Sequence, residues 1–396
     1  MKLLIYSHYF APSVGGVETI VALLARKLSE SRLAQPRADK WDVIVATKTS
    51  ANGFDDSAFP FRVVRSPSLL HLRRLIQWAD VTHIAGPSLA PMFLAKLAGR
   101  PYVVEHHGYQ SICPNGVLIH QPDRAICPGH FQAGHYGACI RCQNQEMSFP
   151  ATLAKLLLMF PRYSLSRKAD LNIAITHHSL ERHRLPRAQA IYYGIEPLRT
   201  DAGLESRSPR DPYDTNNDPP TFAYVGRFVP EKGLDVLFRA ATLLKNNGCH
   251  FQILLIGDGP ERTNLESLIA SNNLQDVVRI TGFLRGPVLT EQMASVDAVV
   301  MPSTWEETAG LSAIEQMMRG RLVIASDIGG LGEIVGDAGL KFPPGDAEAL
   351  ADQMKKVIEY SADVSRLGNA AQARAHSLFL ADRMAADHVS VYQKLG

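Results

Sequence analysis

The sequence has no run of apolar residues long enough to cross a membrane, which takes about 20 consecutive residues. The apolar residues at its start, 1–6, are too few for the core of a signal peptide, and we interpret them as a strand. Without an export signal we expect a cytoplasmic protein. Its five cysteines are then expected to stay reduced rather than to form disulfides.

Neither sign of charge is in large excess, because the chain has 41 Lys and Arg and 39 Asp and Glu, which leaves a formal net charge of +2. A balance this even argues against a nucleic-acid partner. The charges are unevenly spread: residues 1–200 hold 23 basic and 13 acidic side chains, whereas residues 201–396 hold 18 and 26. The basic half is predicted to face something anionic, and a chance difference between two solvated surfaces is the alternative.

The composition is that of an ordinary globular protein, and the chain is long enough for two domains. Short β-branched runs alternate with longer helical patterns, which indicates βα units on parallel sheets. The predicted fold class is α/β, with two Rossmann-like domains facing each other across a cleft. The predicted strands are Leu3–Tyr6, Val43–Ala46, Val81–Ile84, Tyr102–Glu105, Leu171–Ile175, Phe222–Val225, Phe251–Ile256, Val277–Thr281, Ala298–Met301 and Leu322–Ala325.

A stretch rich in turn-forming residues, 197–220, marks a linker between the two domains. We predict an N-terminal domain over 1–196, with a cysteine-rich insertion at about 109–145. The C-terminal domain is predicted over 221–380. A final helix at 381–396 is predicted to cross back to the N-terminal domain.

Two strand-to-helix turns carry residues suited to an anionic ligand. Gly15 and Gly16 follow the first strand, where the backbone can approach a ligand near a helix N-terminus. The first strand of the second half leads to Arg227 and Lys232, a planar fork and a point charge that suit a diphosphate. Plain turn glycines and solvated cations are the alternatives.

A third turn carries two carboxylates, Glu307 just before a predicted helix and Glu315 about two helical turns later. Ionised carboxylates only accept hydrogen bonds, so they suit the paired hydroxyls of sugars and riboses. Backbone N–H groups near Leu311 would add an anion site at the helix N-terminus. Two solvated glutamates are the alternative interpretation.

Six motifs occur in one order along the chain. They are Gly-Gly-Val-Glu at 15–18, Gly-Arg-Phe to Glu-Lys-Gly at 226–233, Ile-Gly-Asp-Gly-Pro-Glu-Arg at 256–262, Gly-Phe-Leu at 282–284, Glu-x7-Glu at 307–315 and Ser-Asp-Ile-Gly-Gly-Leu-Gly-Glu at 326–333. In this order they resemble the retaining glycosyltransferases of family 4, the glycosyl transferases group 1, which have the GT-B fold. The resemblance covers nearly the whole chain and is densest over 221–345.

The resemblance implies that the C-terminal domain binds the nucleotide sugar and the N-terminal domain the acceptor. It assigns the donor's diphosphate to Arg227 and Lys232, with Gly16 closing on it. It assigns the ribose to Glu315 and the transferred sugar to Glu307. The implied reaction retains the anomeric configuration. We expect the two cations and helix dipoles to stabilise the leaving nucleoside diphosphate without a catalytic metal, since no Asp-x-Asp pair ends an N-terminal strand.

Two further assignments follow from the same resemblance. The backbone of Gly282, Phe283 and Leu284 would meet the base. His107 matches the family's His before Gly and would face the donor sugar, with His106 as the alternative. Ala309 stands where the family usually has Phe, which bears on the identity of the sugar.

Four cysteines fall within 30 residues, and Cys-x2-Cys with two further thiols is the ligand set of a structural zinc site. The predicted ligands are Cys113, Cys127, Cys139 and Cys142. Reduced surface thiols and a disulfide-prone loop are the alternatives.

The segment after the cysteines, from Phe149 to Lys168, interleaves Leu, Met and Phe with cations, which fits a helix lying on an anionic membrane. Packing within the domain is the alternative. We therefore predict a transferase that moves a sugar from a nucleoside-diphosphate sugar to a glycan or lipid-linked acceptor, in cell-envelope polysaccharide or glycolipid synthesis at the inner face of the plasma membrane. The other candidates are a nucleotide-sugar epimerase or hydrolase of the same fold and a non-catalytic glycan-binding subunit.

Overall fold

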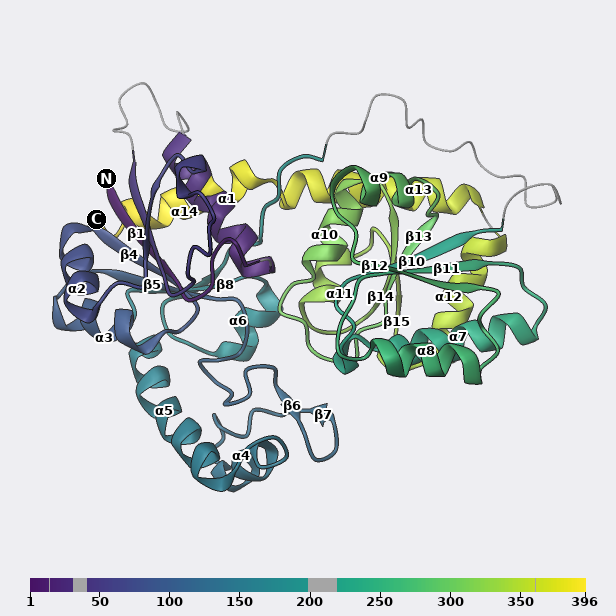
Figure 1. Ribbon diagram of the computed structural model, residues 1–396, viewed down its shortest axis with the longest axis horizontal. Helices are drawn as coiled ribbons and strands as arrows, with labels where there is room; N and C mark the ends of the chain where they lie inside the picture. The colour runs from purple at the N-terminus through teal and green to yellow at the C-terminus, as the bar shows by residue number, and fades with distance from the viewer. Residues whose placement is uncertain (14, 31–40, 199–218, 360) are drawn as a thin grey trace. The chain divides into compact units, whose positions relative to one another are not determined.

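The computed structural model describes residues 1–13, 15–30, 41–198, 219–359 and 361–396 (Figure 1). The chain divides into two compact units. The first unit comprises residues 1–196 and 379–396, and the second comprises residues 197–378. Most of the predicted linker, 199–218, lies outside the described residues.

The first unit is built on a sheet of seven parallel strands in the order β3-β2-β1-β4-β5-β8-β9. The order reverses between β1 and β4, and ligands of such sheets bind beyond the strand ends at that point. The central strands are buried along almost their whole length because helices cover both faces of the sheet. The strands are β1 (Lys2–Ser7), β2 (Asp42–Thr47), β3 (Arg62–Arg65), β4 (Val81–Ala85), β5 (Tyr102–His106), β8 (Leu171–Ala174) and β9 (Ala188–Ala190). The helices include α1 (Gly16–Glu30), α2 (Leu69–Trp78), α3 (Leu89–Leu97), α5 (Phe149–Arg167) and α6 (His177–His183), with a short 3-10 turn η1 (Asp56–Ala58).

The cysteine-rich segment lies between β5 and α5 and forms a small lobe of the first unit (Figure 1). It holds an antiparallel pair of two-residue strands and one helix, which packs on α5. These elements are β6 (Ile119–His120), β7 (Ala125–Ile126) and α4 (Tyr136–Gln143).

The last helix, α14 (Ala381–Gln393), belongs to the first unit and packs on α1. At its start, Asp382 Oδ1 lies 2.8 Å from the Nζ of Lys27. Near its end, the ring of Tyr392 packs edge-on against Trp41. Tyr392 and His388 of this helix are fully buried, so α14 contributes to the core of the unit.

The second unit repeats the architecture with six parallel strands in the order β12-β11-β10-β13-β14-β15, and its order reverses between β10 and β13. The predicted α/β class with two parallel-sheet domains is confirmed. The strands are β10 (Thr221–Val225), β11 (Gln252–Ile256), β12 (Val278–Gly282), β13 (Ala298–Met301), β14 (Leu322–Ser326) and β15 (Leu340–Phe342). The helical elements are η2 (Pro230–Lys232), α7 (Leu234–Asn246), α8 (Arg262–Ser271), α9 (Gly286–Ala294), α10 (Leu311–Met318), α11 (Gly329–Val335), α12 (Ala347–Glu359) and α13 (Ser361–Leu378).

Candidate functional site

Lys232 and Glu307 lie together where the second sheet reverses its order. β10 and β13 are parallel neighbours, so the loops after their carboxyl ends meet at this point. Lys232 ends the 3-10 turn η2 after β10, and Glu307 comes from the loop after β13. The Nζ of Lys232 is 2.9 Å from Oε1 of Glu307. The sequence therefore brings a cation and a carboxylate, 75 positions apart in its numbering, into one ion pair.

The carboxylate of Glu307 is held in one orientation. Its side chain is 5% exposed, and the hydroxyl of Ser303 donates a hydrogen bond to the same Oε1 that Lys232 contacts. The other oxygen, Oε2, lies 3.9 Å from the position that a Cβ on Gly310 would take. With Oε1 saturated, Oε2 is the oxygen best placed to accept a hydrogen bond from a ligand hydroxyl.

Glycine at position 233 permits the close approach of the two loops. Gly233 has a φ of +66°, and a Cβ there would stand 2.0 Å from the carbonyl oxygen of Pro302. The N–H of Thr304 donates to the carbonyl of Glu231 at 3.0 Å, which ties the loops together again. Because both contacts are made by backbone, the geometry of the ion pair follows from the fold of the loops.

Arg227, the other predicted diphosphate ligand, follows β10 directly and its side chain is exposed. Its backbone carbonyl accepts a hydrogen bond from the hydroxyl of Tyr224 at 2.8 Å. Burial, together with the charges of Glu307 and Glu231, raises the pKa of Tyr224 far above its ordinary value, so the hydroxyl remains a donor. The arrangement anchors the backbone of Arg227 and leaves its guanidinium in solvent.

Helix α10 carries the second predicted carboxylate. Gly310, with a φ of +115°, precedes the helix, Leu311 is its first residue and Glu315 lies in its second turn. Glu315 is half-buried, and burial raises its pKa although Arg319 opposes the shift. The structure places Leu311 and Glu315 on the element that begins beside Glu307, without a described contact between the two glutamates.

The predicted base contact lies at the end of β12. The carbonyl of Gly282 accepts a hydrogen bond from the N–H of Gly257 at 2.9 Å, so the ends of β11 and β12 are joined. Phe283 is 60% exposed, and the guanidinium of Arg285 lies 4.6 Å from the centre of its ring. Leu284 beside them is half-buried. An exposed aromatic ring backed by a cation is a surface on which a planar base can stack.

The two adjacent histidines of the first unit differ sharply in their surroundings. His106 ends β5 and is buried, with Nε2 2.9 Å from Oδ1 of Asn172 and Nδ1 3.2 Å from Oγ of Ser111. His107 follows the strand, and its Nδ1 is 2.7 Å from the hydroxyl of Tyr193. Burial lowers the pKa of both imidazoles, and Glu105 opposes that shift. The polar groups of the core thus occupy both ring nitrogens of His106.

The glycine turn of the first unit begins α1. Gly16 is the first residue of that helix, and the carbonyl of Gly15 accepts hydrogen bonds from the N–H and the hydroxyl of Thr19. A Cβ on Gly15 would stand 2.5 Å from Oε2 of Glu18, so a carboxylate lies over this turn. A carboxylate at a helix N-terminus occupies the place that a ligand anion would take.

The four clustered cysteines are buried and free. Burial and the three neighbouring thiols raise the pKa of Cys139 to about 12. Among the described residues, the three donors that come within 4.8 Å of one another are His83, Glu105 and His388, and the sulfurs form no such group. The predicted zinc site is therefore not supported. Cys113, Cys127 and Cys139 pack into apolar clusters, and the sulfur of Cys142 accepts a hydrogen bond from the side-chain amide of Asn115 at 3.5 Å.

Sequence reasoning missed the buried group that surrounds Glu105. Its members come from three elements: His83 from β4, Glu105 from β5 and His388 from α14. Nε2 of His83 is 3.1 Å and Nε2 of His388 3.6 Å from the carboxylate. The signal in the sequence was a charged residue, Glu105, as the last residue of a predicted apolar strand.

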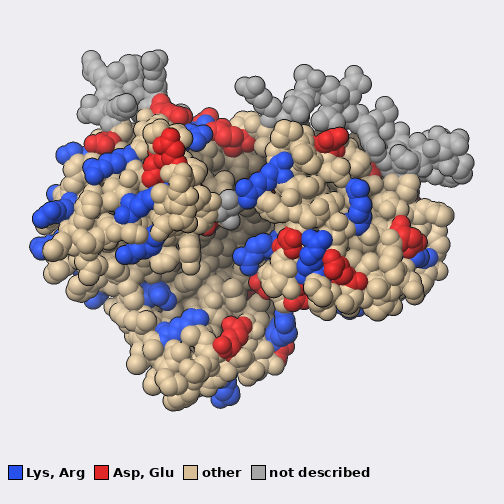
Figure 2. Space-filling model, in the orientation of Figure 1, with Lys and Arg blue, Asp and Glu red and all other residues tan. Residues whose placement is uncertain are grey.

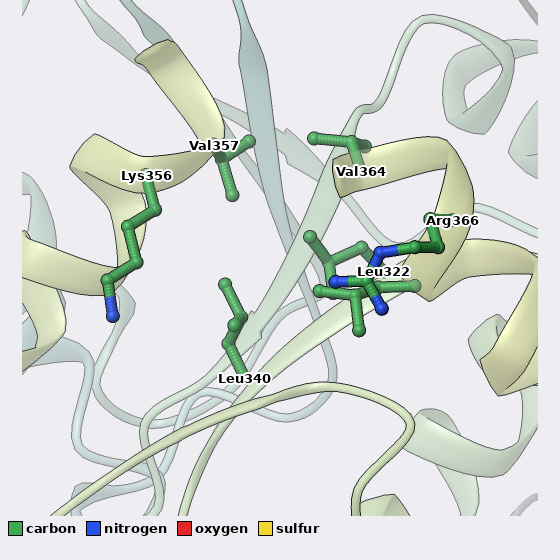
Figure 3. A pocket seen from close by; sticks show the side chains of 7 residues that line it. Leu322, Leu340, Lys356, Val357, Val364 and Arg366 are labelled. Atoms are coloured by element: carbon green, nitrogen blue, oxygen red, sulfur yellow. The ribbon is translucent and has the colours of Figure 1, made fainter. Parts of the chain in front are cut away.

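A separate apolar pocket of about 280 Å³ lies in the second unit (Figure 3). Leu322 and Leu340, which begin β14 and β15, line it together with Val357 of α12 and Val364 of α13. It is therefore at the amino ends of the strands, whereas Lys232 and Glu307 follow carboxyl ends. Ligands of parallel sheets bind at the carboxyl ends, so this pocket is not part of the candidate site.

Comparison with known proteins gives this site a context. Residues 206–374 match the family described as Glycosyl transferases group 1. The matched segment covers less than half of the chain. It includes Arg227, Lys232, Glu307 and Glu315, all four of the charged residues predicted for the donor in the second unit.

Curated relatives of this chain are transferases of sugars. A 2-deoxystreptamine glucosyltransferase of Streptomyces kanamyceticus is 35% identical over 173 residues, which is 43% of each chain. An alpha-D-kanosaminyltransferase of the same organism is 32% identical over 203 residues, 49% of this chain and 52% of that protein. The chain thus spans about half the length of the curated relatives it matches.

Solved structures resemble the chain over its whole length. HepE of Anabaena in complex with UDP has a TM-score of 0.69 at 19% identity, with both chains covered completely. Sucrose-phosphate synthase of Thermosynechococcus elongatus has a TM-score of 0.73 at 20% identity, over 100% of this chain and 98% of that one. The likeness shows the GT-B fold.

Proposed function

We propose that this protein is a retaining glycosyltransferase of family 4 that takes its sugar from a nucleoside-diphosphate donor. The observation that carries the proposal is the ion pair of Lys232 and Glu307 at the strand switch point of the segment that matches the glycosyl transferases group 1. UDP in the related HepE structure supports a nucleoside diphosphate as the ligand class. The whole protein would be a hexosyltransferase.

The chemistry of the site fits the two ends of such a donor. Lys232 and the exposed Arg227 can neutralise the diphosphate, whose negative charge grows as the bond to the sugar breaks. Glu307 keeps Oε2 for a sugar hydroxyl, and Glu315 on α10 would take the ribose. Phe283 and its neighbours would meet the base. The first unit would contribute His107, Gly15 and Gly16 to donor binding.

The reaction is tested by incubating the purified protein with UDP-, GDP-, ADP- and dTDP-sugars and a panel of glycan and lipid-linked acceptors, with mass spectrometry of the products. A product heavier by one hexose, whose new linkage keeps the donor's anomeric configuration by NMR, is the expected result. Release of free sugar alone, or an isomerised donor, would identify a hydrolase or an epimerase. Binding of a nucleotide sugar without any turnover would identify a binding subunit.

We further propose that the acceptor is presented at an anionic membrane surface, as in cell-envelope glycan or glycolipid synthesis at the inner face of the plasma membrane. In the described part of the chain, no helix combines the length and hydropathy that spanning a bilayer requires. Contact would instead be peripheral, through one face of the first unit.

That face is formed by α2, α3 and α5, where α3 packs against both of the other helices. The three helices contain no Asp or Glu, and they carry six Lys or Arg residues. Lys and Arg side chains are visible over α2 and α3 in Figure 2. Apolar side chains are exposed among them: Leu69, Leu70, Phe93, Leu97, Leu153, Leu157 and Leu158 are each at least 39% exposed. Exposed apolar groups among cations are what an anionic lipid surface binds.

A further inference from the structure

The carboxylate of Glu105 is the centre of a buried cluster in the first unit. Its side chain is 1% exposed, and the Nε2 atoms of three imidazoles face it. His83 lies at 3.1 Å and His107 at 3.5 Å, both from Oε2, and His388 lies at 3.6 Å from Oε1. Burial alone would raise the pKa of this carboxyl, but the surrounding imidazoles lower it well below its usual value. A negative charge is thus held inside the core.

The hydrogen bonds around the cluster determine which nitrogens donate. The carboxylate can only accept, so His83 donates from Nε2 and its Nδ1 accepts from the hydroxyl of Tyr392 at 2.8 Å. Nδ1 of His388 faces the carbonyl of Met384 at 2.8 Å and therefore donates. Its Nε2 and Oε1 of Glu105 have no other hydrogen-bond partner in the described structure. His388 and Glu105 thus face each other here without a competing partner among the described residues.

The same rule assigns the proton of His107. Nε2 faces Oε2 of Glu105, which favours the tautomer protonated on Nε2. Nδ1 then accepts from the hydroxyl of Tyr193 at 2.7 Å, which burial keeps protonated by raising its pKa. The ring of His107 also stacks on that of Tyr193. The ring is thus fixed on both sides, by Glu105 and by Tyr193.

We propose that Glu105 is a positioning residue for His107. Its buried carboxylate fixes that imidazole in one orientation and one tautomer, and helix α14 secures the carboxylate through His388 and Tyr392. The end of the chain is therefore part of the support of His107. The inference rests on the role proposed above for His107 in donor binding. The ionisable groups that face His107 are Glu105 on β5, His83 on β4, His388 on α14, Tyr193 after β9 and the adjacent His106. Behind these lie Tyr392 of α14, which contacts His83, and Glu18 of α1 near Tyr193.

Glu105→Gln is the central variant, because it keeps the shape and one acceptor oxygen while it removes the charge. Its amide can also donate, so Nε2 of His107 no longer faces a pure acceptor. We expect kcat to fall by about tenfold or more, since small misplacements of a site residue cost up to about a hundredfold. The pH profile of kcat should shift, while the affinity for UDP, measured by calorimetry, should not change. His388→Gln should change kcat and the pH profile in the same direction by a smaller amount.

Thr82→Val is the matched control, because Thr82 is a buried residue next to His83 whose hydroxyl has no partner in the described structure. It should leave kcat and the pH profile at the wild-type values. A profile in Glu105→Gln equal to that of wild type, with equal kcat, would overturn the inference.

A second readout does not depend on turnover and separates this inference from the proposed function. In protein labelled with ¹⁵N-histidine, the resonances of His107 are identified by their loss in His107→Gln. We expect wild type to show Nε2 protonated and Nδ1 bare, and Glu105→Gln to show a mixture of tautomers. An unchanged tautomer in Glu105→Gln would overturn the inference. Stoichiometric zinc that is lost in Glu105→Gln would also overturn it, by making the cluster a metal site.

Discussion

Lys232 Nζ and Glu307 Oε1 lie 2.9 Å apart where the loops after two adjacent parallel strands meet. The hydroxyl of Ser303 contacts the same carboxylate oxygen. A cation already paired with a carboxylate is oriented before the ligand arrives, so little rearrangement is needed when a phosphate approaches. The pair also explains how the carboxylate of Glu307 can be buried, with only 5% of its side chain exposed, because the charge of Lys232 balances its own.

Replacing Lys232 with Ala should lower turnover at least about a hundredfold, because the charge that stabilises the leaving diphosphate is lost. Initial rates with saturating donor measure this effect. Lys245→Ala is the control, since Lys245 pairs with Asp276 at the surface of the same unit. Turnover of Lys232→Ala equal to that of Lys245→Ala would contradict the role of Lys232.

Gly233→Ala should destabilise the second unit severely. Its Cβ would stand 2.0 Å from the carbonyl oxygen of Pro302, so the loops after β10 and β13 would have to separate. Gly248→Ala is the matched control, because Gly248 also has a positive φ, +76°, but nothing lies within 4 Å of its Cβ position. That variant should lose only about 1–2 kcal/mol of unfolding free energy. Denaturant unfolding with equal losses in the two variants would show that the loop contact is not essential.

The buried thiol of Cys139 should make stability depend on alkaline pH. Its pKa is about 12 in the folded protein against an ordinary value of 9.0, so the unfolded chain releases this proton first. The free energy of unfolding should therefore be constant below about pH 8 and fall as the pH rises above 9. Urea titrations of wild type and Cys139→Ala measure the difference, which should shrink as the pH rises. A constant difference from pH 7 to pH 10 would refute the burial of the thiol.

The apolar and basic face of the first unit should bind anionic vesicles. Vesicles of phosphatidylglycerol and phosphatidylcholine should sediment the protein, and vesicles of phosphatidylcholine alone should not, since each cation near an anionic surface contributes about 1 kcal/mol. Leu157→Glu should weaken this binding, because the side chain is 58% exposed on α5. Leu243→Glu, on α7 of the second unit, is the control. No sedimentation of wild type with anionic vesicles would remove the membrane proposal.

The sequence was sufficient to predict the fold because the central strands are buried and mainly apolar. All ten predicted strands are present, with ends within two residues of those predicted. Five strands were not predicted. The antiparallel pair of β6 and β7 has only two residues in each strand, whereas β3, β9 and β15 lie at the edges of the two large sheets. They are short and half-buried, as in Arg62-Val63-Val64-Arg65, and so lack the apolar run by which a strand is recognised.

The residues of the candidate site are harder to predict where contacts join distant parts of the chain. Lys232 and Glu307 each belong to a motif, but their ion pair depends on the strand order of the second sheet. The cluster around Glu105 has no local pattern, because its partner His388 is 283 positions away in the numbering and lies on a helix that returns to the first unit. The cysteine spacing predicted zinc, and spacing alone does not show that three of the four cysteines pack into two apolar clusters.

The most direct test of the central claim is calorimetric titration of UDP and of UDP-glucose into wild type and Glu307→Gln, with Glu306→Gln as the neighbouring control. Glu307 is proposed to contact only the sugar. Its loss breaks the ion pair with Lys232, which affects UDP and UDP-glucose alike. Binding of UDP-glucose should therefore weaken by about 1.5–3 kcal/mol more than binding of UDP, the value of a hydrogen bond to a charged group. If another base or sugar is the natural one, the same pair of titrations applies to that nucleotide and its sugar. If the binding of nucleotide and of nucleotide sugar weakens equally, or neither weakens, the result contradicts the claim that this carboxylate binds the sugar of a nucleoside-diphosphate donor.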